Sequence, residues 1–254
     1  MTKKKVAILG ATGLVGQRMI SLLYNHPQFE ISAVCASERS IGKRYKEVTE
    51  WKMPVPIPPA VGDMVVKPCE PKGVDADIVL SSLPAQNALE IEPMFAKEGY
   101  PVDSKASSFR MEDDIPLIVP EINADHLGLI DIQKKKRKWD GFIVTDPNCT
   151  TIGFSLPLAV IYRTYGLDYS FMTSMQALSG MGLPGYSFDL RDNVIPFIRG
   201  EEEKVEKEIL KILGKFNGKE IEKANFSMFA SCNRVNVIDG HLESLFCKTR
   251  QVVD

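Results

Sequence analysis

The sequence predicts an α/β protein in which a doubly wound, mostly parallel sheet of the Rossmann type is followed by a second α+β domain. Three observations predict this fold. Strand-like and helix-like segments alternate through the first half of the chain, a glycine-rich turn joins the first strand to the first helix, and longer patterns follow residue 147. We therefore expect a first domain at residues 1–147 and a second at residues 148–254.

The first domain is predicted from hydrophobic periodicity and from its turn residues. Helices are expected at residues 13–26 and 84–99, the second between Pro84 and Gly99. The proline-rich stretch 51–63 should be a loop or an edge, because proline has no N–H to donate to a sheet. Short apolar runs predict strands at residues 4–9, 29–37, 76–84, 100–104, 116–121 and 141–145.

The second domain has fewer and longer segments. The patterns predict strands at residues 169–180, 226–237 and 241–250. They predict helices at residues 150–166, 187–200 and 201–216, of which the last is amphipathic.

The bulk composition excludes several classes of function. With 44% apolar and 25% charged residues, it is typical of a soluble globular protein. A net charge of −2 gives no basis for binding nucleic acid or an anionic membrane, and the basic run at 134–138 is interpreted as a solvated helix end. Five widely spaced cysteines without a CxxC pair predict free thiols in a cytoplasmic protein, with neither a disulfide nor a metal site.

The segment LGATGLVG is a candidate nucleotide-binding turn. Its glycines allow a tight turn and a close approach of phosphate to the backbone at a helix N-terminus. The GxxGxxG spacing is a weak signal alone and also fits a plain strand-to-helix turn, but its place at the start of a β-α-β series favours a dinucleotide. The residues expected to contact it are Gly10, Thr12, Gly13, Leu14, Val15 and Gly16.

The end of the second strand indicates which dinucleotide binds. In CASERSIGK, the side chains of Ser37, Arg39 and Ser40 suit the 2′-phosphate of NADP. Glu38 is the residue that would instead hold the ribose of NAD. We interpret this segment as favouring NADP.

The stretch DPNCTTIGF places Cys149 where a strand gives way to a helix. Unpaired N–H groups and the dipole at a helix N-terminus should lower the thiol pKa toward neutrality. A thiolate beside a nicotinamide can attack an acyl carbon and form a thioester, which then exchanges hydride. The alternative is a buried structural cysteine, an interpretation that fits the other four cysteines better.

Together the motifs GATGLVG, PNCTT, QALSGMG, NVIPFI with EEEK, and CNRVNVIDGH resemble aspartate-β-semialdehyde dehydrogenases, most of all the archaeal and fungal branch, from Lys5 to Thr249. The resemblance implies NADPH-dependent reductive dephosphorylation of L-β-aspartyl phosphate to L-aspartate 4-semialdehyde through a cysteine thioester. This step belongs to the biosynthesis of lysine, threonine, methionine and isoleucine. It also implies a homodimer or homotetramer assembled through the second domain.

The resemblance assigns roles to individual residues. Cys149 corresponds to the nucleophile and His241 to the acid/base, and we expect the Cys149 N–H and the Asn148 side chain to form an oxyanion hole. The expected substrate-binding residues are Arg110 for the phosphoryl group, Gln176 for orientation, Arg234 for the carboxylate, and Asn148, Glu201 and Lys204. Further cofactor contacts are expected from Ser179 and Gly180.

The chemistry of these residue types agrees with the assignment. Arginine suits bidentate carboxylate binding, and a histidine of near-neutral pKa can take and return the thiol proton. Glu201 and Lys204 also fit a solvated ion pair one helical turn apart. His26 and His126 are expected at the surface.

Three residues and the chain end depart from the family pattern. Lys105 and Asp146 stand where asparagine is usual, and Met181 stands where alanine is expected. Members of the family continue beyond the position of Asp254, so we expect a truncated chain.

Two rival functions stay open at this point. Malonyl-CoA reductases and N-acetylglutamyl-phosphate reductases share the glycine turn, the cysteine and the histidine. A non-catalytic NADP-binding module would carry an unreactive Cys149.

Overall fold

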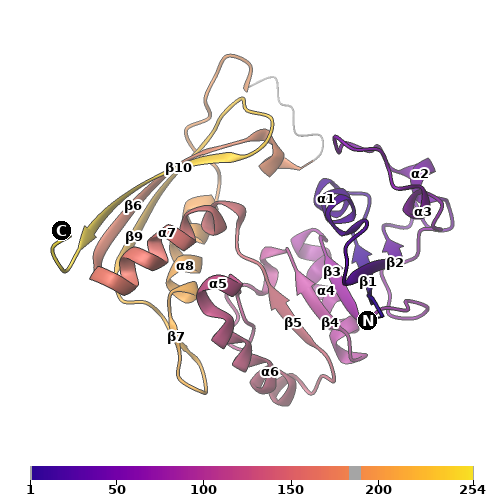
Figure 1. Cartoon of the computed structure of the whole chain (residues 1–254), viewed down its shortest axis with the longest axis horizontal. Helices are drawn as coiled ribbons and strands as arrows, with labels where there is room; N and C mark the ends of the chain where they lie inside the picture. Colours follow the sequence, from indigo (N-terminus) through magenta and orange to yellow (C-terminus); the bar gives the residue numbers. More distant parts are fainter. Residues whose placement is uncertain (1, 183–189, 254) are drawn as a thin grey trace. The chain divides into compact units, whose positions relative to one another are not determined.

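The computed structural model describes residues 2–182 and 190–253, which form two compact units (Figure 1). The first unit comprises Met1–Phe109 and Ile130–Asp146, and the second comprises Arg110–Leu129 and Pro147–Asp254. The last junction, between residues 146 and 147, lies beside the predicted boundary. Residues 110–129 also belong to the second unit, although the predicted boundary assigns them to the first domain.

The sheet of the first unit is parallel throughout, with the strand order β2-β1-β3-β4-β5. Because all strands run the same way, their carboxyl ends lie along one edge, where open α/β sheets bind ligands. The strands are β1 Lys4–Leu9, β2 Phe29–Cys35, β3 Ile78–Ser81, β4 Pro101–Ser104 and β5 Phe142–Thr145.

Helices connect these strands and pack on the sheet. α1 contacts β1 and β2, and α4 contacts β3, β4 and β5. Pro84 caps α4, as predicted, and the proline-rich stretch ends in the short helix α3, whose first residue is Pro59. The helices are α1 Leu14–Leu23, α2 Tyr45–Val48, α3 Pro59–Gly62, α4 Ala85–Lys97 and α6 Leu129–Arg137, with the 3₁₀ turn η1 Ser107–Phe109.

Both tryptophans of the chain lie in the first unit. The Trp51 indole N–H donates to the Val55 carbonyl at 2.5 Å, and its ring meets Tyr45 edge-on with centroids 6.5 Å apart. Trp139 is buried, with the Arg137 guanidinium 5.1 Å from its ring centroid. The two indoles therefore sit in different surroundings within one unit.

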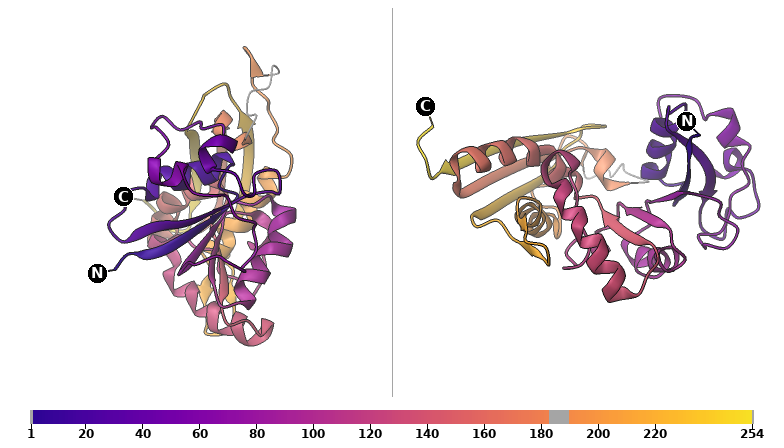
Figure 2. Two further views of the ribbon diagram at one scale, coloured as in Figure 1. Left: turned by 90° about the vertical axis from the view of Figure 1, so that its right-hand side faces the viewer. Right: turned by 60° about the horizontal axis from the view of Figure 1, so that its bottom comes forward.

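The sheet of the second unit has three long strands in the order β10-β6-β9, with β10 antiparallel and β9 parallel to β6. Helices α7 Cys149–Tyr165 and α8 Glu201–Ile212 lie along one face of it (Figure 2). The remaining elements are α5 Pro120–Asn123, η2 Ala124–Gly128, β6 Leu167–Gln176, η3 Leu178–Met181, β7 Lys215–Phe216, β8 Ile221–Glu222, β9 Ser227–Arg234 and β10 His241–Thr249.

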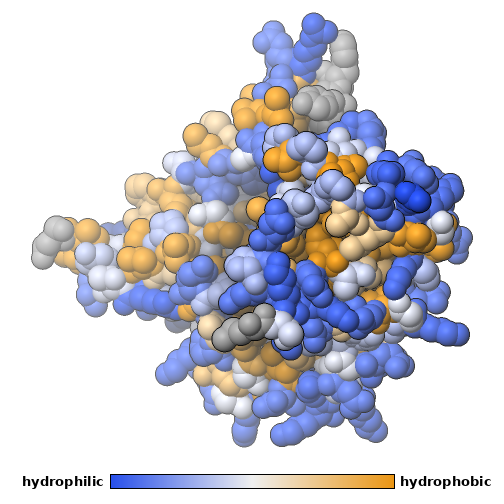
Figure 3. Space-filling model, turned by 45° about the vertical axis from the view of Figure 1, so that its right-hand side comes forward, coloured by the Kyte–Doolittle hydropathy of each residue, from blue (hydrophilic) through white to orange (hydrophobic). Residues whose placement is uncertain are grey.

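The alternation of burial in this sheet separates two faces. Met172, Ser174 and Gln176 of β6 are buried beneath the helices, whereas Phe171 and Met175 are exposed. Apolar patches reach the surface among hydrophilic residues in the space-filling view (Figure 3). In the ranges that the structure covers, no helix is both long and apolar enough for a membrane span.

Two predicted elements are wrong. Residues 116–121 form no strand, because the Asn123 side chain takes the Leu117 carbonyl and the Val119 N–H that a neighbouring strand would need. The predicted helix 187–200 does not extend through residues 191–200, where Ile195 exchanges two backbone hydrogen bonds with Arg234, and Leu190 is in a 3₁₀ turn. Residues 187–189 lie outside the described part of the chain.

His126 is buried, contrary to the expected surface position. Its Nδ1 contacts the Asn123 side-chain nitrogen at 3.0 Å and its Nε2 contacts the Gly214 carbonyl at 3.2 Å. Burial lowers its pKa, so the neutral ring is favoured. The polar partners, which no sequence pattern reveals, explain why a histidine is tolerated in this core.

Candidate active site

The glycine turn of the first unit is tightly closed at the end of β1. Gly10 has a positive φ of 74°, and a Cβ on Gly16 would stand 2.5 Å from the Gly10 carbonyl oxygen. The Ala11 N–H donates to the Cys35 backbone carbonyl at 3.0 Å, and the buried Tyr45 hydroxyl donates to the Ala11 carbonyl at 2.7 Å. Only glycine therefore fits positions 10 and 16.

The N-terminus of α1 follows this turn without a side-chain cap. Its N-cap residue is Gly13, which has no side chain to accept a hydrogen bond from the N–H groups of the first turn. Thr12 and Leu14 are partly exposed, and Val15 is exposed. An uncapped helix N-terminus at a closed glycine turn is a suitable site for a phosphate.

A second turn follows β2, the strand beside β1. Leu9 pairs with Cys35 in the parallel register, so the two strand ends are neighbours. The turn is closed by the Ser40 N–H, which donates to the Ser37 carbonyl at 2.9 Å. Ser37 and Arg39 are exposed while Ser40 is buried. The structure thus brings both predicted cofactor segments of the first unit to one edge of the sheet.

Asn148 fixes the start of α7 in the second unit. Its side-chain oxygen accepts the N–H of Thr150 at 2.9 Å, and its side-chain nitrogen donates to the Glu201 carboxylate at 2.7 Å. Cys149 is therefore the first residue of a properly capped helix, exposed to solvent.

Three of the predicted residues form one row across the three-stranded sheet. His241 of β10 pairs with Gln176 of β6, and Gln176 pairs with Arg234 of β9. Directly paired residues place their side chains on the same face, here the face beneath α7 and α8. Gln176 and Arg234 are buried, and the Gln176 side-chain oxygen has no hydrogen-bond partner in the described structure. We call this set the His–Gln–Arg row.

The imidazole of His241 reaches the nucleophile. Its Nε2 lies 3.1 Å from the Cys149 sulfur. Its Nδ1 lies 2.7 Å from the Gly240 carbonyl oxygen, to which it donates when Nδ1 carries the proton. When Nδ1 carries no proton, it accepts from the Ala177 N–H, whose nitrogen is 3.1 Å away. The ring therefore has a partner in either tautomer, as a group that takes and returns a proton needs.

The expected lowering of the Cys149 pKa is wrong. Protein atoms packed around the thiol raise its pKa, the Glu201 carboxylate raises it further, and the N–H groups at the helix start offset this only in part. The helix start alone would lower the thiol pKa, but burial and the neighbouring acid outweigh it. Deprotonation thus needs a base, and His241 is in contact.

The remaining substrate residues surround Asn148 and the start of α8. Glu201 is buried, and the Lys204 ammonium lies 3.3 Å from its carboxylate. This is the i,i+3 ion pair expected as one alternative for these two residues. Arg110 is buried and donates through Nη1 to Glu208 at 3.0 Å. All these side chains belong to the second unit.

Ser179 and Gly180 lie in η3, directly after β6. A Cβ on Gly180 would stand 2.8 Å from Nη1 of Arg234 and 3.3 Å from the His241 ring. Arg234 also donates to the Ala177 carbonyl at 2.6 Å. A glycine at position 180 therefore leaves the space that the Arg234 and His241 side chains require.

Two acids of this unit, the buried Glu208 and the half-buried Glu243, were not predicted from the sequence. Glu208 accepts hydrogen bonds from Arg110 and from the Asn148 backbone. Glu243 follows His241 on the same face of β10 and contacts Gly153 of α7, and burial raises its pKa to about 7. The available signal was a charged residue at a core position of a periodic pattern, most visibly Glu208 between Val205 and Ile209.

Two of the unusual residues pair with each other in the first unit. The Lys105 ammonium contacts the Asp146 carboxylate and donates to Asp103 at 2.8 Å, at the carboxyl ends of β4 and β5. Burial and the neighbouring Asp146 raise the Asp103 pKa to about 6. Lys105 and Asp146, which both depart from the expected pattern, therefore form an ion pair with each other.

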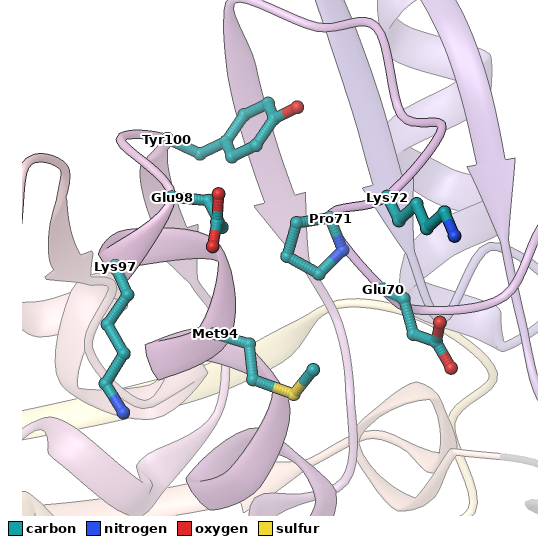
Figure 4. A pocket seen from close by; sticks show the side chains of 7 residues that line it. All are labelled: Glu70, Pro71, Lys72, Met94, Lys97, Glu98 and Tyr100. Atoms are coloured by element: carbon teal, nitrogen blue, oxygen red, sulfur yellow. The ribbon is translucent and has the colours of Figure 1, made fainter.

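One open hollow lies elsewhere in the first unit, at the amino end of β4. It measures about 540 Å³, and Met94, Lys97 and Tyr100 line it from α4 and the following turn, facing residues 70–72 (Figure 4). This is the sheet edge opposite the glycine turn. Among the described residues, no group of three or more His, Cys, Asp or Glu side chains is arranged to hold a metal ion.

The fold and the site define a class of protein. A parallel sheet with a closed glycine turn is a dinucleotide-binding fold, and a thiol in contact with an imidazole beside a buried arginine is the chemistry of a dehydrogenase that forms a thioester.

Comparison with known proteins identifies the family. Residues 5–130 match the NAD-binding domain of semialdehyde dehydrogenases, and residues 158–254 match their dimerisation domain. The chain is 53% identical over 242 residues to the aspartate-semialdehyde dehydrogenase of Archaeoglobus fulgidus, covering 95% of this chain and 70% of that protein. The chain belongs to the aspartate-semialdehyde dehydrogenase family.

Two further similarities bear on the fold and on the rivals. The crystal structure of aspartate-semialdehyde dehydrogenase with NADP from Candida albicans superposes with a TM-score of 0.89 at 41% identity, covering 97% of this chain and 72% of that one. The malonyl-CoA reductase (NADP) of Metallosphaera sedula is 39% identical over 254 residues, covering 98% of this chain and 71% of that protein. The predicted fold class and the predicted family resemblance are confirmed.

Proposed function

We propose that this chain catalyses the NADPH-dependent reductive dephosphorylation of L-β-aspartyl phosphate to L-aspartate 4-semialdehyde, a step in the biosynthesis of lysine, threonine, methionine and isoleucine. The single observation that carries the proposal is the His–Gln–Arg row, whose histidine lies 3.1 Å from the Cys149 sulfur. The first unit would bind the cofactor and the second would bind the substrate.

The residues of the first unit fit NADP. The closed glycine turn and the uncapped N-terminus of α1 suit the pyrophosphate, and the exposed Ser37 and Arg39 suit the 2′-phosphate. When bound, NADPH supplies the hydride that reduces the thioester. Ser179 and Gly180 are proposed as cofactor contacts from the second unit.

The protein's own residues supply the other steps. His241 accepts the thiol proton through Nε2, and the Cys149 thiolate attacks the acyl carbon, forming the thioester as phosphate leaves. After reduction, expulsion of the aldehyde returns a thiolate, which takes back the proton that His241 carried. The Cys149 N–H and the Asn148 amide are the proposed oxyanion donors, although one Asn148 N–H is directed at Glu201.

The substrate is held by the groups around the nucleophile. Arg234 would bind the α-carboxylate, Gln176 would orient the substrate with its unpartnered oxygen, and Glu201 would contact the ammonium group. Arg110 and Lys204 would bind the phosphoryl group. These assignments rest on residue chemistry and on their convergence in one unit.

We propose a homodimer as the minimal assembly, with a tetramer as the alternative. The face of the three-stranded sheet that turns away from the helices exposes a row of three aromatic rings, Phe246, Phe171 and Phe229, which are paired across β10, β6 and β9. Such a continuous apolar row favours association with a second copy. Free cysteines support the proposed cytoplasmic location.

The test is NADPH formation from aspartate semialdehyde, NADP and inorganic phosphate. We expect phosphate-dependent turnover that disappears in Cys149→Ala and persists in Cys247→Ala, whose thiol lies on β10 away from the imidazole. Turnover retained without Cys149 would contradict the mechanism. Faster turnover with malonyl-CoA and NADPH would favour the reductase rival, and bound NADP with no turnover on either substrate would favour the non-catalytic module.

A further inference from the structure

Glu208 joins two parts of the proposed site that are distant in the sequence. Its side chain is 1% exposed on α8. One carboxylate oxygen accepts from Arg110 Nη1 at 3.0 Å, and the other accepts from the backbone N–H of Asn148 at 2.7 Å. A buried carboxylate that accepts from a guanidinium and from a backbone N–H is held firmly in place. Losing either donor would leave part of its buried charge uncompensated, which costs free energy.

The bond to Asn148 acts on the nucleophile through the backbone. Asn148 immediately precedes Cys149 and is held at its main-chain nitrogen by Glu208 and at its side-chain nitrogen by Glu201. Its oxygen caps α7. Glu201 and Glu208 lie seven residues apart on α8. One helix therefore holds Asn148 at two atoms and so fixes the position of the Cys149 backbone.

The bond to Arg110 acts on the proposed phosphoryl contact. The same helix holds the Arg110 backbone, because the buried Lys211 ammonium donates to the Arg110 carbonyl at 2.7 Å and to the Ile115 carbonyl at 2.8 Å. α8 therefore fixes both the main chain and the guanidinium of this arginine. A spacing error between guanidinium and sulfur would misplace an acyl phosphate that contacts both.

We propose that Glu208 is a positioning residue for the reaction, which sets the guanidinium of Arg110 at a fixed place relative to the turn that carries Cys149. The inference rests on the proposed function, since it takes Arg110 as the contact for the phosphoryl group. Glu208 itself touches no substrate and acts through its two partners.

The test compares Glu208→Gln with Glu203→Gln on the same helix, where Glu203 is exposed and pairs with Lys207. A glutamine has one acceptor oxygen for two donors, so one of them loses its partner. We expect the KM for inorganic phosphate to rise about tenfold and kcat to fall, with the KM for aspartate semialdehyde nearly unchanged. The control should match the wild type in all three values.

A merely structural role predicts a different pattern. Loss of all activities in proportion to a lowered thermal midpoint, or no change in the phosphate KM, would overturn the proposal. If Glu208→Gln does not fold, Glu208→Asp keeps the charge and shortens the reach by one methylene, and the same two criteria apply to it.

A double-variant cycle tests the route through Arg110. If Glu208 acts by orienting that guanidinium, Arg110→Gln with Glu208→Gln should raise the phosphate KM no further than Arg110→Gln alone. Full additivity of the two effects would overturn the proposal. A wild-type protein without phosphate-dependent turnover would instead contradict the proposed function itself.

Discussion

The two sheets of this protein carry their candidate functional residues in different places. In the five-stranded sheet these residues follow the strands, in the turns beyond the carboxyl ends of β1 and β2. In the three-stranded sheet they lie on the strands themselves, in the His–Gln–Arg row. A parallel sheet between helices offers a ligand only its edge, whereas a sheet with a helix-covered face can present side chains in register.

Different chemical features therefore matter in the two units. At the strand ends of the first unit, backbone conformation and the absence of side chains determine whether a phosphate fits. On the strands of the second unit, side-chain identity and strand register determine whether the reacting groups meet. Four substitutions test this contrast.

The largest effect is expected on the strands of the second unit. His241→Gln keeps the size of the side chain but removes the proton acceptor, so kcat should fall about 10³-fold. Ser244→Ala, an exposed residue of the same strand, is the control and should leave kcat unchanged. A kcat within tenfold of the wild type in His241→Gln would remove the row from the mechanism.

The next effect is expected at the strand ends of the first unit. In Gly16→Ala the new Cβ would stand 2.5 Å from the Gly10 carbonyl oxygen and 2.7 Å from Ala11 Cα, both backbone atoms. The turn must open, at a cost of about 3 kcal/mol, and NADPH affinity should fall correspondingly. Isothermal titration measures the affinity. Iodoacetamide labelling of Cys149 should be unaffected, and a parallel loss of thiol reactivity would contradict the division of roles.

A smaller effect is expected from a buried acid beneath the first sheet. Glu92 is fully buried, accepts from Ser104 at 2.8 Å, and has a pKa raised to about 7, chiefly by burial. A raised folded-state pKa favours folding of the protonated form, so this group's contribution to stability declines as pH rises from about 4.5 to 7.

The test of this pH dependence is Glu92→Gln. The variant should match the wild type near pH 5 and exceed its unfolding free energy by about 2 kcal/mol at pH 8, because the amide carries no charge to bury. Urea unfolding at both pH values measures the difference. Glu90→Gln, exposed on the same helix, should show none. Equal differences at the two pH values would show that Glu92 does not titrate in this range.

The smallest effect is expected on the outer face of the second sheet. Phe246→Lys places a charge in the row of phenylalanines and should weaken self-association about tenfold, while kcat per folded chain at high concentration is retained. Sedimentation equilibrium measures the association. Leu22→Lys, an exposed apolar residue of the first unit, should leave it unchanged. Unaltered association in Phe246→Lys would place the interface elsewhere.

The sequence predicted most of the fold and all members of the His–Gln–Arg row, but not their register. Periodicity located β6, β9 and β10, because in each strand one face is less exposed than the other. It failed at residues 116–121, an apolar run that is mostly buried but forms no strand. Glu208 escaped notice because a buried acid is recognised by its partners, and Arg110 and Asn148 lie far away in the sequence.

The placement of both indoles in the first unit makes the protein's intrinsic fluorescence a reporter of one unit only. Emission from Trp51 and Trp139 will follow the loss of the parallel sheet and its helices, while far-ultraviolet circular dichroism follows both units. Denaturation curves from the two signals will coincide only if the units unfold together. If the two curves are displaced, the interval between their midpoints gives the range of denaturant concentration in which one unit is unfolded and the other is still folded.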